Sequence, residues 1–83
     1  MYYGEYCIYG VSVPYTIKDG NAYDFYAFPT KAERDKWVDA HEYNGTDYVA
    51  APVKRRVMEK VIGKDFKVVP DYYGNGLNAV VRA

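Results

Sequence analysis

The stretch AYDFYAFPTKAERDKWVDAH, residues 22–41, decides how the rest of the chain folds. In its first part Tyr23, Phe25 and Ala27 fall on one face of an extended segment, and this two-residue period is typical of a β-strand. Pro29 ends the segment, because proline lacks the N–H that a continuing strand would use. The beginning of the stretch therefore predicts a strand.

A helix is predicted directly behind this strand, over residues 31–41, which contain no glycine or proline. Thr30 stands three residues before Glu33, which is the spacing of a helix capping box. The chain's single tryptophan, Trp37, lies in this segment. Asn44-Gly45 follows it, and glycine suits the left-handed position just past a helix end.

The N-terminal part predicts two more strands. Met1–Tyr9 is rich in tyrosine, a residue that favours strands. Val11–Ile17 alternates between apolar and polar positions, as a strand with one solvated face does. Asp19-Gly20-Asn21 is strong turn chemistry, so we expect Val11–Ile17 and Ala22–Phe28 to form a hairpin.

A second helix is predicted over Pro52–Ile62, with Pro52 at the first helical position, where a missing N–H costs nothing. Thr46–Ala50, before it, is expected to be short and extended. Gly63 is expected to close the helix. An apolar stripe at helical spacing runs along it, made of Val53, Val57, Met58, Val61 and Ile62.

The C-terminal part predicts two short strands, Phe66–Pro70 and Leu77–Val81, joined by a turn in which Asn75-Gly76 is a hairpin signal. Strands thus occur in hairpins at both ends, with the helices between them. The sequence predicts a single α+β domain over residues 1–83: an antiparallel sheet of three to five strands with two short helices packed on one face.

Composition limits the classes of protein that this chain can belong to. Its 83 residues make one domain with a modest core. Aromatic residues make up 18% of the chain, including 11 tyrosines, and such a chain should fold. A single cysteine cannot form an internal disulfide, which favours a reducing cytoplasm. No signal peptide and no apolar run of membrane-spanning length is recognised, so no membrane association is expected.

Charge is divided unevenly along the chain, although its net value is zero. Residues 1–50 carry a net charge of −4 and residues 51–83 a net charge of +4. Such a division fits a polar partner or head-to-tail self-association into a homodimer. It also fits two ordinary solvated faces, which is the commoner case.

Candidate catalytic and metal-binding residues are few. Cys7 and His41 are the only cysteine and histidine, so they form the one conceivable nucleophile–base pair. The alternative is a small buried thiol and a histidine placed favourably at a helix end. Asp35, Asp39 and Glu42 have a spacing that permits a cation site, but solvated acidic residues on a helix are far commoner. The sequence therefore predicts no enzyme, no metal and no cofactor.

Two sets of residues favour binding instead. The tyrosines are too many for so small a core, and exposed tyrosine is enriched at protein interfaces; the alternative is that tyrosine simply suits strands. A basic face on the second helix favours nucleic acid, although zero net charge argues against that partner. The residues of this basic face are Lys54, Arg55, Arg56 and Lys60.

The run FPTKAERDKWV, residues 28–38, resembles a T-K-x-E-R-D-x-W-V helix found in small accessory proteins of bacteriophages and mobile elements. The resemblance extends over roughly Tyr23–Val69. It implies no catalytic residues. It implies a protein acting in the cytoplasm of a bacterial host, because small phage proteins of this size are often inhibitors of host defence, anti-CRISPR proteins among them. The implied partner is a bacterial protein such as a CRISPR effector.

Three hypotheses follow from the sequence. The first is an inhibitor that covers a partner's surface, with acidic residues steering it toward a basic channel. The second is a small nucleic-acid-binding module, and the third is a homodimer joined through sheet edges or opposed charges. The residues predicted to bind the partner in the first hypothesis are Tyr2, Tyr3, Tyr6, Tyr72, Tyr73, Asp35, Asp39 and Glu42.

Overall fold

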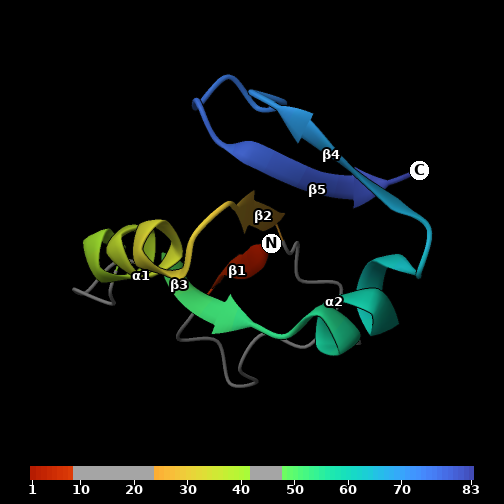
Figure 1. Cartoon of the computed structure of the whole chain (residues 1–83), viewed down its shortest axis with the longest axis horizontal. Coiled ribbons are helices and arrows are strands. Elements are labelled where there is room, and N and C mark those ends of the chain that lie inside the picture. The colour runs from red at the N-terminus through yellow and green to blue at the C-terminus, as the bar shows by residue number, and fades with distance from the viewer. Residues whose placement is uncertain (9–23, 42–47) are drawn as a thin grey trace.

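The computed structural model describes residues 1–8, 24–41 and 48–83, and in this part of the chain five strands form one antiparallel sheet accompanied by two helices. The strand order across the sheet is β3-β1-β2-β5-β4 (Figure 1). The predicted α+β class and antiparallel sheet are confirmed. The elements are β1 (Tyr2–Ile8), β2 (Asp24–Phe28), α1 (Lys31–Ala40), β3 (Tyr48–Val53), α2 (Arg55–Ile62), β4 (Phe66–Pro70) and β5 (Asn78–Arg82).

The tyrosine-rich strand β1 lies inside the sheet, between β3 and β2. In its register Tyr3 is opposite Ala27 of β2 and Val53 of β3. Strands β4 and β5 form the predicted C-terminal hairpin, with Val68 opposite Val80. β5 joins this hairpin to β2, so the sheet is continuous from edge to edge.

The core is divided between the two faces of the sheet, because successive side chains of a strand point to opposite sides. Phe25 belongs to a buried cluster that includes Met58 of α2. Its neighbour Tyr26 belongs to a second cluster that includes Trp37 of α1. The two helices therefore cover opposite faces of the sheet, whereas the sequence analysis placed both on one face.

Connectivity explains this difference. Every pairing in the sheet is antiparallel, so β2, β3 and β4 are parallel to one another. The connections through α1 and α2 are then crossovers, which almost always have the same right hand. The first runs from β2 to one edge of the sheet and the second from that edge to the other. The connection through α1 and the connection through α2 thus cross the sheet in opposite directions. Because both are right-handed, they pass over opposite faces of the sheet.

Most predicted elements are confirmed. β1, β2, α1, β4 and β5 lie at or within about two residues of their predicted bounds, and Gly63 caps α2 with a φ of 87°. Thr30 caps α1, its Oγ1 accepting a hydrogen bond of 3.1 Å from the backbone N–H of Glu33. The predicted hairpin partner of Ala22–Phe28 is wrong over the described strand, because β2 has β1 on one side and β5 on the other. The strand Val11–Ile17 itself, its turn at Asp19-Gly20-Asn21 and the helix end at Asn44-Gly45 lie outside the described residues.

The predicted start of the second helix is wrong. Pro52 is paired with Gly4 in strand β3, and α2 begins at Arg55. β3 is the outermost described strand on its side of the sheet. A proline is tolerated at such an edge because no described strand beyond it needs its N–H. The apolar stripe of α2 is narrower than predicted. Met58 is fully buried, whereas Val57 is 43% exposed, because neighbouring residues are about 100° apart around a helix.

In the described part of the chain, neither helix is long and apolar enough to cross a membrane.

Candidate functional site

Trp37 is the buried centre of an aromatic cluster on the α1 face of the sheet. It projects from α1 onto β1, where a Cβ atom at Gly4 would lie 2.5 Å from its Cζ3 atom. Glycine at that position therefore lets the indole lie directly on the backbone. The ring centroids of Phe28 and Tyr26 are each 5.3 Å from that of Trp37. The indole is thus fixed on three sides by β1 and β2.

The C-terminal end of α1 completes this aromatic cluster. His41 caps the helix, and its Nδ1 lies 2.9 Å from the backbone oxygen of Trp37. Its ring centroid is 5.5 Å from that of Trp37 and 5.7 Å from that of Tyr6. His41 therefore lies at a helix end, as the non-catalytic alternative in the sequence analysis expected, and it packs against the rings of Tyr6 and Trp37. The Cys7 side chain lies outside the described residues, so the nucleophile–base pair stays untested.

The loop between β4 and β5, residues 71–77, stands beside this cluster. Asp71 adopts a positive φ of 52°, and its Oδ1 accepts a hydrogen bond of 2.7 Å from the N–H of Gly76. Asn75 accepts a hydrogen bond from the N–H of Leu77 at 3.1 Å. The Nδ2 of Asn75 also donates to the Tyr26 hydroxyl at 3.3 Å. These bonds hold the loop in one conformation and attach it to β2.

Two exposed tyrosines on this loop extend the cluster to the surface. Tyr72 and Tyr73 are 53% and 49% exposed, and their rings meet edge to face at 4.9 Å. Tyr73 also contacts the ring of Tyr26 at 6.2 Å. Partial burial, together with the Asp24 carboxylate, raises the pKa of Tyr73 to about 12. The Tyr73 phenol is therefore neutral at physiological pH. Both rings present flat apolar area with a hydroxyl at one end.

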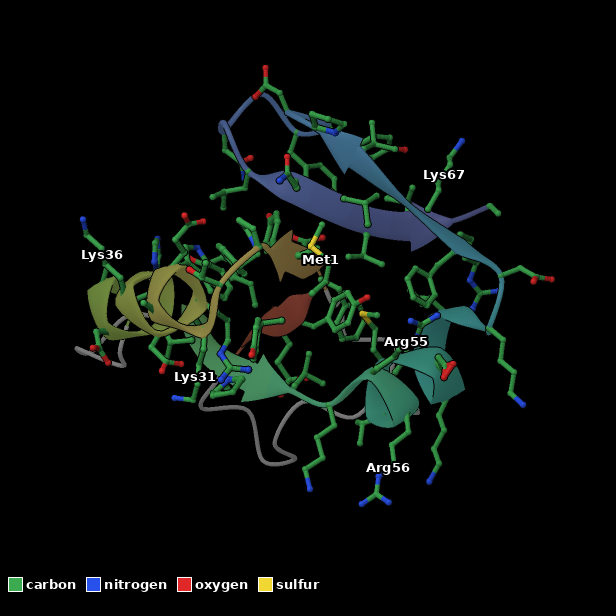
Figure 2. All side chains as sticks on the ribbon, viewed as in Figure 1. Met1, Lys31, Lys36, Arg55, Arg56 and Lys67 are labelled. Atoms are coloured by element: carbon green, nitrogen blue, oxygen red, sulfur yellow. The ribbon has the colours of Figure 1, made fainter. Side chains whose placement is uncertain are left out.

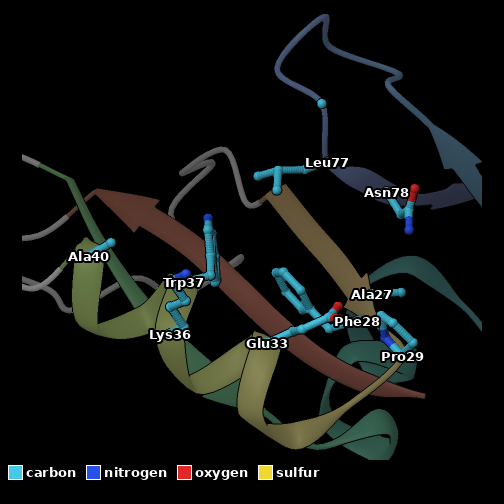
Figure 3. Close-up of a pocket in the computed structure, with 10 residues that line it drawn as sticks. Ala27, Phe28, Pro29, Glu33, Lys36, Trp37, Ala40, Leu77 and Asn78 are labelled. Carbon is cyan, nitrogen blue, oxygen red and sulfur yellow. The ribbon is translucent and has the colours of Figure 1, made fainter.

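A groove separates α1 from the loop, and we call it the α1–loop groove (Figure 3). Its volume is about 380 Å³, and Phe28, Trp37 and Leu77 supply its large apolar side chains. Glu33 and Lys36 of α1 provide the charged groups along it. A smaller and more polar hollow of about 210 Å³ adjoins it on the other side of Trp37 and Leu77, next to the aromatic cluster.

The chemistry of this groove suits binding of an apolar group. It combines apolar walls with one carboxylate and one ammonium group, which is the general composition of a binding site. In residues 1–8, 24–41 and 48–83, no three His, Cys, Asp or Glu side chains are grouped so that they could hold a metal ion.

The structure separates the tyrosines predicted to bind a partner. Tyr72 and Tyr73 lie together on the β4–β5 loop, with Tyr73 against Tyr26. Tyr2, 43% exposed, lies instead near the start of α1, where the Arg34 guanidinium is 5.7 Å from its ring. Tyr3 is a core residue, only 8% exposed, because its position on β1 faces α2. It is thus unavailable as contact surface. Tyr6 is partly buried in the aromatic cluster.

The predicted acidic steering patch is weaker than its sequence suggests. Asp35 forms ion pairs with Lys31 and Arg34, so much of its charge is balanced locally. The hydrogen bond from Lys31, followed by that from Arg34, lowers the pKa of the Asp35 carboxyl. Asp39 is exposed, and Glu42 lies outside the described residues.

The predicted basic face is present on α2, on the other side of the sheet. All four of its residues are exposed. Arg55 lies against the body of the protein, 4.9 Å from the Phe66 ring centroid, whereas Arg56 points away (Figure 2). Lys54 and Lys60, like Arg56, form no ion pair with a described residue.

Two features of the structure were missed by the sequence analysis. The α1–loop groove joins residues about forty positions apart, and only the crossover topology brings them together. Glu5 is the second: it lies on β1, opposite Phe25 and Ala51, and burial raises its pKa from 4.5 to about 7. A signal for Glu5 existed, since strand alternation places it on the same face as Tyr3.

Comparison with known proteins found no matching family model, no matching curated protein and no matching solved structure. The function must therefore be inferred from the geometry of the described surfaces.

Proposed function

We propose that this protein is a non-enzymatic protein-binding module that acts by covering a surface of its partner. The observation that carries the proposal is the α1–loop groove, an open apolar groove. The loop that supplies Gly76 and Leu77 to its wall also carries the exposed Tyr72–Tyr73 pair. Exposed apolar surface of this kind commonly marks an interaction site.

The composition of the surface favours a protein as the partner. Tyrosine and tryptophan are enriched among the residues that carry most of the energy of protein interfaces, and these residues cluster around well-packed pockets. Here Tyr72 and Tyr73 are held on a loop whose conformation is fixed by Asp71 and Asn75. A surface that is already ordered loses little conformational entropy on binding.

The setting that we propose comes from the resemblance of residues 28–38 to small phage accessory proteins. In that setting the partner is a protein of a bacterial defence complex, such as a CRISPR effector. The chain acts stoichiometrically, in the cytoplasm of the host cell, by sterically blocking a channel or a subunit interface. The absence of an evident catalytic set in the sequence agrees with inhibition by binding alone.

A plaque assay tests this proposal. The protein is expressed in bacteria that carry an active defence system, and these cells are challenged with a phage that the system restricts. We expect the wild-type protein to restore plaque formation and Leu77→Glu to abolish the restoration, since a carboxylate in the groove excludes an apolar partner group. Restoration that survives both Leu77→Glu and the double substitution Tyr72→Ala, Tyr73→Ala would contradict the proposed surface.

The matched control is Val57→Glu. Val57 is also an exposed apolar residue, 43% exposed, but it lies on α2, on the opposite side of the sheet from the groove. We expect this variant to behave as the wild type does. Circular dichroism of each variant shows that loss of restoration is not loss of folding.

A second candidate function is nucleic-acid binding through α2. The observation that favours it is that Lys54, Arg56 and Lys60 are exposed without a described acidic partner. Contacts to phosphates release counterions, so the affinity for single-stranded DNA should fall steeply with salt. We expect Arg56→Ala with Lys60→Ala to reduce that slope. Binding that does not respond to salt excludes this function.

A further inference from the structure

A basic pocket lies between the starts of the two helices, away from the α1–loop groove. Its volume is about 320 Å³, and every charged side chain that lines it in the described structure is a cation: Arg34, Lys54 and Arg55. Tyr2 and Val53 supply much of the remaining wall. We call this site the basic pocket.

Arg34 is the fixed member of the pocket. Its side chain is only 13% exposed, and its Nε donates to Asp35 Oδ1 at 2.9 Å. Its Nη1 donates to the backbone oxygen of Tyr3 at 3.5 Å, and the Tyr2 ring lies 5.7 Å from its guanidinium carbon. No buried side-chain nitrogen or oxygen of a described residue lacks a partner. The Nη2 group of Arg34, which has no hydrogen-bond partner among the described residues, is therefore open to solvent, and Arg34 lines the pocket.

The other cations come from the start of α2. Arg55 is positioned by the Phe66 ring, 4.9 Å away, and its Nε lies 3.9 Å from Glu59. Lys54 is the N-cap of α2 and makes no side-chain capping bond, and the first turn holds no acidic residue. The positive end of the helix dipole thus adds to the field of the cations.

Two carboxylates lie beside the pocket, but they do not neutralise it. Asp35 is shared between Arg34 and Lys31, and Glu59 is paired loosely with Arg55. Lys54 forms no ion pair with a described residue. The cations around the pocket therefore outnumber the carboxylates, and an external anion can complete the site.

We propose that the basic pocket binds a phosphate monoester. Such a group carries close to two negative charges at neutral pH and three acceptor oxygens, which matches cations arriving from two elements. A guanidinium held in one orientation can bind it with two parallel hydrogen bonds. The pocket is larger than one phosphate group, and Tyr2 and Val53 offer apolar contact to whatever carries the phosphate. This proposal is independent of the function proposed for the α1–loop groove.

Titration of the ¹⁵N-labelled protein with phenyl phosphate at low salt, followed by NMR, tests the proposal. We expect saturable shifts of the Arg34 side-chain Nε–H and of the Lys54 and Arg55 amides. Arg34→Lys keeps the charge but loses the planar fork, so we expect about tenfold weaker binding. Lys54→Ala should weaken binding about threefold, by loss of one charge.

The matched control is Arg56→Ala, because Arg56 belongs to the same helix but points away from the body of the protein. Unchanged affinity in this variant supports a defined site. A loss equal to that of Lys54→Ala means general attraction to a basic helix and overturns the proposal, as does the absence of saturable shifts. Inorganic phosphate is the second arm: weaker binding than phenyl phosphate indicates an ester as the ligand, and equal binding indicates free phosphate.

Discussion

Gly4 is the residue at which we expect the smallest chemical change to have the largest effect. A Cβ atom there would lie 2.5 Å from Cζ3 and 3.0 Å from Cε3 of Trp37, so the indole would have to move away from β1. We expect Gly4→Ala to lower the free energy of unfolding by about 2 kcal/mol, the usual cost of forcing extra volume into a packed site. Urea unfolding followed by tryptophan fluorescence measures this change.

A double-mutant cycle identifies the cause of that effect. If the clash with the indole is responsible, Gly4→Ala should cost much less in a Trp37→Leu background, where the smaller side chain leaves room for the added methyl group. Costs that simply add would mean that the glycine is needed for its backbone freedom instead.

Glu5 should make the stability of the protein depend on pH. Burial raises its pKa from 4.5 to about 7. At a pH between these two values, the Glu5 carboxyl is mostly protonated in the folded state and mostly ionised in the unfolded state. The contribution of the neutral carboxyl is complete below the unfolded pKa and is lost as the pH rises through the folded pKa. Ionisation of this carboxyl should lower the free energy of unfolding by about 2 kcal/mol, allowing for partial solvation.

The measurement is the difference in free energy of unfolding between Glu5→Gln and the wild type, taken from about pH 5 to about pH 8. Glutamine stays neutral and has a similar shape, so this difference should increase in favour of the variant as the pH rises. A difference that does not change with pH would show that Glu5 titrates normally.

Local patterns were sufficient to predict most elements. The alternation of Tyr23, Phe25 and Ala27 identified β2, and Thr30 identified the start of α1. The turn chemistry of Asp71–Gly76 located the hairpin of β4 and β5. In each case the signal is contained in a few consecutive residues, so no knowledge of the tertiary structure is needed.

The errors arose where a residue has two structural uses. Pro52 suits the first turn of a helix and also an edge strand, and only the position of β3 at the edge of the sheet distinguishes them. Tyr2 and Tyr3 are neighbours of the same residue type, so the sequence does not distinguish them. In the structure Tyr3 faces α2 and is buried, whereas Tyr2 lies at the surface. The α1–loop groove depends on which face each helix covers, and that follows from the direction of the crossovers rather than from any single segment.

The arrangement of the whole sheet bears on self-association, because a β-sheet that ends in open strands can pair with a second copy. The β3 edge includes Pro52, which has no N–H to donate, and the N–H of Ala50 is already bonded to the backbone oxygen of His41 at 3.1 Å. The β4 edge is five residues long and includes Lys67 and Pro70. Short strands, prolines and lysines at an edge are devices that oppose pairing.

We therefore expect sedimentation velocity to find a monomer even at high protein concentration. The double substitution Lys67→Thr, Pro70→Thr removes both blocking residues from the β4 edge, and we expect this variant to self-associate more than the wild type does. A wild-type dimer that dissociates as salt is added would instead indicate pairing of opposed charges, because screening weakens attraction between exposed ions. A wild-type dimer that resists salt would contradict the view that the edges are protected, and Lys67→Thr, Pro70→Thr would then show whether β4 is the strand that pairs.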